Sequence, residues 1–335
     1  MDIDPIQLTR RLVDIESITY NEGAVGEYLA DVLGWFKFQV EKMPVEAGRF
    51  NVYASSGVTP DVVLSTHMDT VPPFFGSSED DEFIHGRGSC DAKGIIAAQI
   101  AAALRLRDSG VKAGLLFLVG EERDSAGANV ANTQPRGSRF LINGEPTDNR
   151  VAIAAKGALR AEIRAKGRMA HSAYPELGES AIHKLVEALD RVLALELPVV
   201  EAIGPTTLNI GTIQGGHAPN VIADDASALV LVRLVGDSAG VRQQIVDAVG
   251  DLANVNFTLE IPFMRFRAFD EMRGMETMVA AFTTDIPALT AWGEPVLLGP
   301  GSIHVAHTDR ERLAKKELLE AVDLYERVAT ELVKS

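Results

Sequence analysis

The chain has 335 residues, with 32 Lys and Arg against 47 Asp and Glu, which gives a formal net charge of −15 at pH 7. Hydrophobic residues make up 46% and charged residues 24%, so a disordered or fibrous chain is excluded. The acidity argues against a nucleic-acid backbone as partner, because phosphate binding needs clustered Lys and Arg. At roughly 100–200 residues per domain, the length indicates about two domains.

The single cysteine, Cys90, excludes an intrachain disulfide, as is typical of proteins in a reducing compartment. The first residues lack the basic segment and apolar core of a signal peptide. No uninterrupted apolar stretch reaches the ~18 residues that a transmembrane helix needs. We therefore expect a soluble, cytoplasmic protein.

The first part of the chain alternates predicted helices and strands. Asp4 and Pro5 form a capping signal for a helix that runs to about Ile15. Further helices are expected at 22–36 and 94–107, and strands at 62–66, 115–119, 140–143 and 151–155. Apolar strands that alternate with helices predict an α/β domain with a mostly parallel sheet.

The middle of the chain has a different pattern. Strands are expected at 158–165, 207–211, 227–234 and 256–261, and helices at 179–195 and 239–252. This β-α-β-β-α-β order predicts a small ferredoxin-like module. We place it as an inserted domain at 157–266. Residues 1–156 and 267–335 then form one domain, which resumes with a strand at 296–298 and ends with a helix at 310–334.

Five segments place His, Asp or Glu just beyond a predicted strand or at the start of a helix. His67 can ligate a metal through one ring nitrogen while Asp69 accepts the other N–H, although a strand-end His is often ordinary. Asp91 can equally be a helix cap. The adjacent Glu121 and Glu122 would repel each other unless a cation lies near them, but they would be unremarkable on a solvated loop.

The two remaining segments contain Glu145 and the pair His304 and His307, both of which could lie near a metal. In an open α/β sheet, ligands gather at the carboxyl ends of the strands. Imidazoles and carboxylates that converge there form a mixed nitrogen and oxygen donor set. Such a set suits paired divalent metals, zinc first.

The sequence motifs HMDTVP, GRGSCDAKG, GEE, GEPT and GPGSIHVAH occur in this order along the chain. As an ordered set they resemble the M20 family of zinc metallohydrolases, specifically its acetylornithine deacetylase and succinyl-diaminopimelate desuccinylase branch. The resemblance covers essentially the whole chain. It implies a zinc-peptidase-like catalytic domain, and it implies that the inserted domain is a lid and dimerisation domain.

The resemblance also implies a role for each residue of the site. His67 and Glu145 would bind one zinc ion, and Glu122 and His307 the other. Asp91 would bridge both ions. Asp69 would orient His67, and Glu121 would be the general base. The spacing of the last motif selects His307 over His304, which would tune substrate binding or be incidental.

Four further segments resemble substrate-binding parts of the family. His171, in GRMAHS, would reach across a dimer interface to stabilise the oxyanion. Asn220 and Arg233 would bind substrate, Arg233 through a carboxylate. Gly301 and Ser302 would line the amino-acid end of the substrate.

The expected activity is acetylornithine deacetylase-like, as in amino-acid biosynthesis. Water activated by two zinc ions per chain, which cobalt could replace, would cleave an N-acyl amino acid, with Glu121 as the base. The alternative is an M20 dipeptidase or carboxypeptidase, or a succinyl-diaminopimelate desuccinylase-like enzyme. We expect a homodimer formed through the lid domain, with no nucleic-acid or membrane partner.

Three other classes of protein are weighed against this expectation. A non-catalytic metal or amino-acid binding protein would have no need of Glu121. A cysteine hydrolase built on Cys90 lacks an assigned His base. A serine hydrolase would need a GxSxG elbow with an assigned His base; the one match to that pattern, GDSAG at 236–240, has none.

Overall fold

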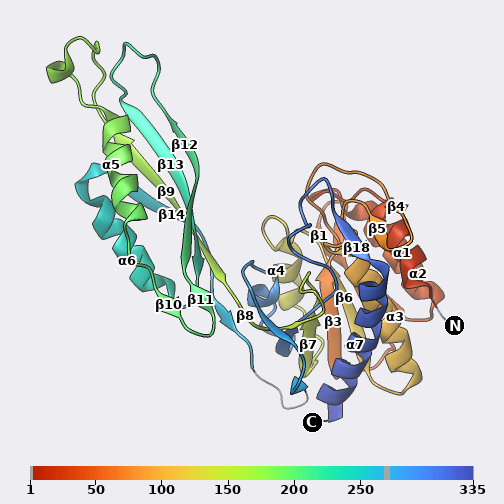
Figure 1. The fold of residues 1–335 in the computed structure, drawn as a ribbon. Helices are drawn as coiled ribbons and strands as arrows, with labels where there is room; N and C mark the ends of the chain where they lie inside the picture. Colours follow the sequence, from red (N-terminus) through yellow and green to blue (C-terminus); the bar gives the residue numbers. More distant parts are fainter. Residues whose placement is uncertain (1–2, 268–271, 335) are drawn as a thin grey trace. The chain divides into compact units, whose positions relative to one another are not determined.

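A computed structural model describes residues 3–267 and 272–334, which form two compact units (Figure 1). The first unit comprises Met1–Ile153, Phe266–Met278 and Thr284–Ser335. The second comprises Ala154–Arg265 and the short segment Val279–Thr283, which the sequence did not assign to it. The domain boundaries expected at 156/157 and 266/267 stay predictions.

The first unit is built on a six-stranded sheet in the order β1-β2-β6-β3-β7-β17. Its strands are β1 (Gln39–Glu46), β2 (Arg49–Ser55), β3 (Val62–His67), β6 (Ala113–Leu118), β7 (Phe140–Asn143) and β17 (Glu294–Leu297). The last four pair in parallel, whereas β1, β2 and β6 pair antiparallel. This confirms the α/β class, and it adds an edge hairpin that the sequence reasoning did not predict.

Helices cover both faces of this sheet. One face carries α1 (Pro5–Val13), α2 (Gly23–Trp35), α3 (Lys93–Asp108) and α7 (Lys315–Lys334). The other carries α4 (Ala126–Asn132) and the 3₁₀ helix η4 (Ile286–Ala288). Successive strand residues point to opposite faces. Val63 and Leu64 are accordingly both fully buried but belong to different apolar clusters.

Two small three-stranded sheets are also present. One contains β18 (Arg312–Ala314), β5 (Phe83–His85) and β4 (Ser78–Glu79), and the other β15 (Met264–Arg265), β8 (Val151–Ala155) and β16 (Thr277–Ala280). The terminal helix expected from Arg310 begins only at Lys315, because 312–314 pair with β5 instead.

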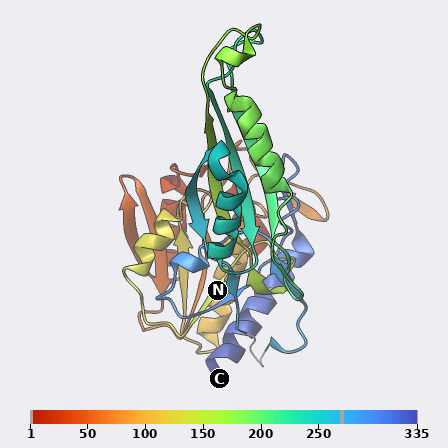
Figure 2. The same cartoon turned by 90° about the vertical axis from the view of Figure 1, so that its left-hand side faces the viewer.

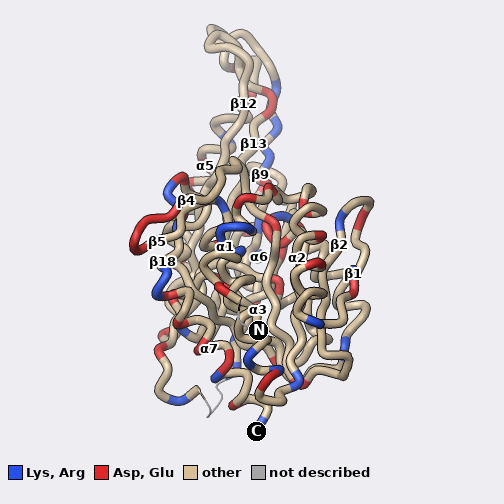
Figure 3. Tube along the Cα trace, turned by 90° about the vertical axis from the view of Figure 1, so that its right-hand side faces the viewer, with Lys and Arg blue, Asp and Glu red and all other residues tan. Residues whose placement is uncertain are grey.

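The acidic run 79–82 forms the exposed turn between β4 and β5, where acidic positions cluster in Figure 3. Asp80 accepts hydrogen bonds from the N–H groups of Glu82 and Phe83 and contacts His85. These bonds hold the pKa of Asp80 below its usual range. Part of the acidic excess is therefore a structured surface turn.

The second unit is a four-stranded antiparallel sheet in the order β12-β13-β9-β14. In chain order its elements are β9 (Gly157–Lys166), α5 (Ala181–Leu193), β12 (Thr207–Gly215), β13 (Asp225–Leu234), α6 (Ser238–Val249) and β14 (Asn254–Ile261). Both helices lie on one face of the sheet (Figure 2). This confirms the predicted ferredoxin-like βαββαβ module. Short elements between them are η1 (Pro175–Leu177), β10 (Val199–Val200), β11 (Gly204–Pro205) and η2 (Gly250–Leu252).

Within the described part of the chain, no helix has both the length and the apolar character that crossing a bilayer requires.

Candidate metal centre

Most of the predicted ligands lie just beyond neighbouring parallel strands. His67 is the last residue of β3, Glu122 lies shortly after β6, and Glu145 lies shortly after β7. The carboxyl ends of parallel strands meet at one edge of a sheet. Because β6, β3, β7 and β17 are consecutive in the sheet, these side chains converge. Asp91 joins them from the loop before α3.

His67 is buried, with 1% of its surface exposed, and its two ring nitrogens face different groups. Nδ1 lies 3.0 Å from the backbone oxygen of Asp69, and 3.4 Å from that residue's Oδ1. Nε2 lies 2.9 Å from Oδ1 of Asp91. When Nδ1 donates its proton to Asp69, the lone pair of Nε2 is free to face a cation. His67 therefore has the orientation of a metal ligand.

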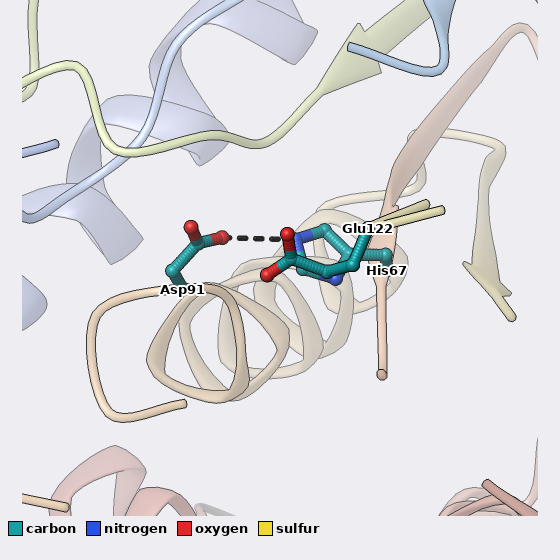
Figure 4. A group of neighbouring side chains, drawn as sticks. All are labelled: His67, Asp91 and Glu122. Carbon is teal, nitrogen blue, oxygen red and sulfur yellow. Dashed lines mark hydrogen bonds and ion pairs between the residues drawn. The ribbon is translucent and has the colours of Figure 1, made fainter. Parts of the chain in front are cut away.

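Asp91 lies between two imidazoles. Its Oδ1 faces His67, and its Oδ2 lies 3.4 Å from Nε2 of His307. The same His307 nitrogen is 2.8 Å from Oε1 of Glu122. Figure 4 shows Asp91 bonded to His67 with Glu122 beside them, and ligand atoms of these three residues all lie within 4.8 Å of one another. A carboxylate with each oxygen toward a different imidazole has the geometry of a bridge between two cations.

Closely packed carboxylates disfavour one another's charge at this site. Burial raises the pKa of Glu145 well above its usual value, and Asp91 raises it further. The pKa of Glu121 is raised in the same way, first by burial and then by Glu145. Oε1 of Glu145 is buried without a hydrogen-bond partner. These carboxylates need positive charge between them, and the nitrogen and oxygen donors fit divalent cations such as zinc.

Asp69 connects two parts of the site. Beyond its contact with His67, its carboxylate accepts hydrogen bonds from the backbone N–H groups of Glu121, at 3.1 Å, and Glu122, at 3.2 Å. It also accepts one from the hydroxyl of Thr19, at 2.8 Å. Burial alone would raise the pKa of Asp69, but the bonds from His67 and Thr19 hold it below its usual value. One carboxylate thus orients a ligand and fixes the loop of the two glutamates.

Three of the predicted substrate residues lie in the second unit. His171 forms a bridge with Val221, and Ser172 donates its N–H to the backbone oxygen of Asn220, so the loops of His171 and Asn220 lie side by side. Arg233 is half-buried on β13, and burial lowers its pKa. No carboxylate pairs with it within residues 3–267 and 272–334. Its guanidinium is therefore available to an anionic ligand.

The loop that precedes His307 is held by backbone contacts. The N–H of Gly301 bonds to the carboxylate of Glu317 at 2.8 Å, and the oxygen of Ser302 accepts a bond from the Cys90 thiol. Both histidines are exposed, and His307 is the one that contacts the carboxylates of Asp91 and Glu122 among the described residues. His307 has a φ of 63°, in the left-handed region. That conformation is uncommon outside glycine, although it is less rare for His than for most residues.

Three residues near the site were not predicted from the sequence. Thr19 supports Asp69, and Glu311 accepts bonds from the loop of Asp91. Asp285 is buried, and burial raises its pKa to about 7. None of the three lies in a motif or directly after a predicted strand. Only the folded chain brings them to the site.

Comparisons with known proteins relate this chain to M20 peptidases. The family profile M20_dimer, described as a peptidase dimerisation domain, matches residues 153–255. A peptidase M20 domain-containing protein of Schizosaccharomyces pombe is 39% identical over 338 residues, which span 96% of this chain and 83% of the relative. A probable carboxypeptidase of Aspergillus fumigatus is 39% identical over 372 residues, which span 95% of this chain and 84% of the relative.

Solved structures show the same fold. A tripeptidase from Staphylococcus aureus superimposes with a TM-score of 0.82 at 22% identity, covering 99% of this chain and 98% of that chain. A dinuclear metal binding peptidase of the M20 family from Bacillus subtilis gives a TM-score of 0.72 at 16% identity, covering 98% of each chain.

Replacement of His307 by Ala should remove one of two bound ions, because the second cation position would lose its only nitrogen donor. We expect zinc-reconstituted wild type to hold two ions per chain and His307→Ala one, measured by elemental analysis after gel filtration. His304→Ala is the matched control, three positions away on the same loop. Loss of an ion from His304→Ala, with none lost from His307→Ala, would overturn the assignment.

Proposed function

This chain belongs to the M20 peptidase family, and from that premise we propose that it cleaves a peptide bond whose leaving amine carries a free carboxylate, as a carboxypeptidase or dipeptidase. As a member of the family it is a metallopeptidase or amidohydrolase. The half-buried guanidinium of Arg233, which pairs with no carboxylate of the described residues, is the observation that supports a free carboxylate on the substrate. Such a group favours a carboxylate ligand, which it can bind through two parallel hydrogen bonds.

The sequence alone favours acetylornithine deacetylase-like activity, with a dipeptidase or carboxypeptidase as the alternative. We prefer the alternative. The relatives that share 39% of their aligned residues are named as carboxypeptidases or as M20 domain proteins, which favours the alternative. Both reactions break an amide whose nitrogen belongs to an amino acid with a free carboxylate. A residue such as Arg233 serves either one, so the acyl side of the substrate distinguishes them.

We propose that His67 and Glu145 hold one zinc ion, that Glu122 and His307 hold another, and that Asp91 bridges the two. Zinc is the first candidate because of the mixed nitrogen and oxygen donors, and cobalt could replace it. Bound at these residues, the ions would supply positive charge that polarises the amide carbonyl and acidifies water.

Glu121 is proposed as the general base. It would take a proton from the attacking water and return that proton to the leaving nitrogen, since an amide anion is too basic to depart. Burial and Glu145 raise its pKa well above the usual value, which suits a carboxylate that must accept a proton and later donate it. Asp69 fixes the backbone of Glu121 and so limits how far the base can move.

The second unit is proposed to form a homodimer. Its match to a peptidase dimerisation domain is supported by an open sheet edge at β12 and by exposed apolar side chains. Ile182 and Val186 on α5 are 37% and 59% exposed, and Ile213 on β12 is 62% exposed. An unpaired edge strand and apolar surface favour association with a second copy. His171 would then stabilise the oxyanion in the partner's site.

Glu121→Gln should abolish turnover while both metal ions stay bound. Loss of a general base lowers the rate by about 10²–10⁴-fold, whereas Glu121 contributes no proposed ligand atom. The matched control is Glu122→Gln, one residue along the same loop, which should lose metal. Turnover and metal content are measured on the same preparations. A fully active Glu121→Gln would refute the base assignment.

Arg233→Met should lower kcat/KM for substrates with a free carboxylate by about 10–100-fold, mainly through KM, because a charged hydrogen bond of about 1.5–3 kcal/mol is lost. Hydrolysis of dipeptides, N-acetyl and N-succinyl amino acids and their carboxyl-amidated forms is compared in the presence of zinc. Amidated substrates should be poor for the wild type and unaffected by the substitution. Arg160→Met, at an exposed arginine of the same sheet, is the control. Equal hydrolysis of free and amidated substrates would contradict the proposal.

Mixing His171→Ala with Glu121→Gln subunits should restore part of the activity, since a hybrid dimer contains one site with both residues intact. Native mass spectrometry establishes that hybrids have formed, and each variant alone serves as the inactive reference. No recovery in proven hybrids would count against a site shared between subunits.

A further inference from the structure

We propose that Glu311 is a positioning residue that fixes Asp91, and through Asp91 the placement of both cation positions. This inference rests on the proposed function, in which Asp91 is the bridging ligand. Glu311 lies just before β18, far along the chain from Asp91.

Three backbone N–H groups point at one oxygen of Glu311. Oε1 accepts hydrogen bonds from Gly88 at 2.9 Å, from Asp91 at 3.1 Å and from Cys90 at 3.2 Å. In a fourth bond, the N–H of Gly86 donates to the backbone oxygen of Glu311 at 3.1 Å. Glu311 is 1% exposed, so water does not compete for these bonds.

The other oxygen of Glu311 is occupied by Arg87. The guanidinium donates to Oε2, is itself only 2% exposed, and lies 5.1 Å from the ring of Phe75. This pairing compensates the buried negative charge, which would otherwise be costly. Oε1 therefore remains free to accept the three N–H groups of the loop.

The hydrogen bonds to Glu311 fix the position of the Asp91 backbone. Hydrogen bonds from residues 88, 90 and 91 to one atom fix the peptide planes that lead to its Cα. The side chain has to place Oδ1 and Oδ2 toward two different imidazoles at once. A shift of the backbone would lengthen one of these contacts, since the carboxylate itself is rigid. Glu311 is thus suited to set the position of Asp91 through the backbone N–H of that residue.

A purely structural ion pair offers a competing explanation. In that case Glu311 would serve only as the counter-ion of Arg87, and its loss would lower stability without a specific effect on metal binding. The two explanations differ in which atom matters. The positioning role needs an oxygen acceptor at Oε1, whereas the counter-ion role needs only charge balance.

Two double variants separate these roles at equal net charge. Arg87→Met/Glu311→Gln keeps an oxygen acceptor for the three N–H groups, and Arg87→Met/Glu311→Met removes it. Replacement of a buried ion pair by residues of similar volume is often tolerated. Zinc affinity is measured by calorimetry, and the visible spectrum of the cobalt-loaded protein reports ligand geometry. Hydrogen exchange of residues 86–92 in chelator-treated protein reports the loop without metal.

We expect Arg87→Met/Glu311→Met to bind zinc about 10–100-fold more weakly than Arg87→Met/Glu311→Gln, as is typical when a group that supports a ligand is lost. Its cobalt spectrum should change, and its amides at 88–91 should exchange faster. Equal affinities, spectra and exchange in the two variants would overturn the proposal. If wild type itself bound no zinc, the proposed function would fail, which is a distinct result.

Arg87→Lys covers the case in which Arg87→Met/Glu311→Met does not fold. It keeps the Glu311 carboxylate but loosens the ion pair, so Tm should fall while zinc affinity changes by less than about twofold. A loss of zinc affinity of about 10-fold or more in Arg87→Lys, which keeps the acceptor oxygen of Glu311, would show that this oxygen is not what positions Asp91, and the positioning role would be wrong.

Discussion

Mutual repulsion among buried carboxylates is the constraint on which the site depends. Glu122 and Glu145 lie with Asp91 and His67 at one edge of the sheet. Burial and neighbouring charge raise the pKa of both glutamates, whereas His307 and His67 hold the pKa of Asp91 below its usual value against the effect of burial. Bound cations would stabilise the ionised cluster, whereas a buried glutamate without them can keep its proton. The two oxygens of Asp91, each directed at a different imidazole, indicate where that positive charge would lie. Part of the net charge of −15 therefore belongs to a site suited to cations.

Much of the chain outside the ligands keeps this cluster in place. Asp69 joins His67 to the loop of the two glutamates, and Glu311 joins the loop of Asp91 to the strand before α7. Both are buried carboxylates whose oxygens accept hydrogen bonds from backbone N–H groups and from side chains, and neither is a proposed metal ligand. The site is thus built from acids with two different tasks, and hydrogen-bond partners distinguish them more clearly than residue type does.

The sequence predicted the parts of the fold that periodicity and apolar runs specify. The strands that end near His67, Glu122 and Glu145 were predicted because each is a short apolar run in the sequence. In the structure all three strands are buried on both faces. The hairpin of β1 and β2 was missed. Its first strand is a mostly exposed edge that contains Pro44 and alternating charges, so only pairing identifies it.

The residues of the site likewise divide into those that the sequence predicted and those that it missed. Ligands that follow strands were found from the sequence together with the family resemblance, and their roles stay predictions. Glu311 was missed because 310–334 has the pattern of one helix, whereas residues 312–314 pair with β5 before the helix begins. Thr19 was missed because a threonine in a loop carries no signal until its contact with Asp69 is seen.

The central claim is that one carboxylate, Asp91, bridges two cations. Diffraction at the zinc absorption edge from crystals of the zinc-loaded protein tests it most directly. We expect two anomalous peaks about 3.5–4 Å apart, as in other paired sites, one beside His67 and Glu145 and one beside Glu122 and His307. Each peak should contact one oxygen of Asp91. A single peak, or peaks that do not touch Asp91, would contradict the account.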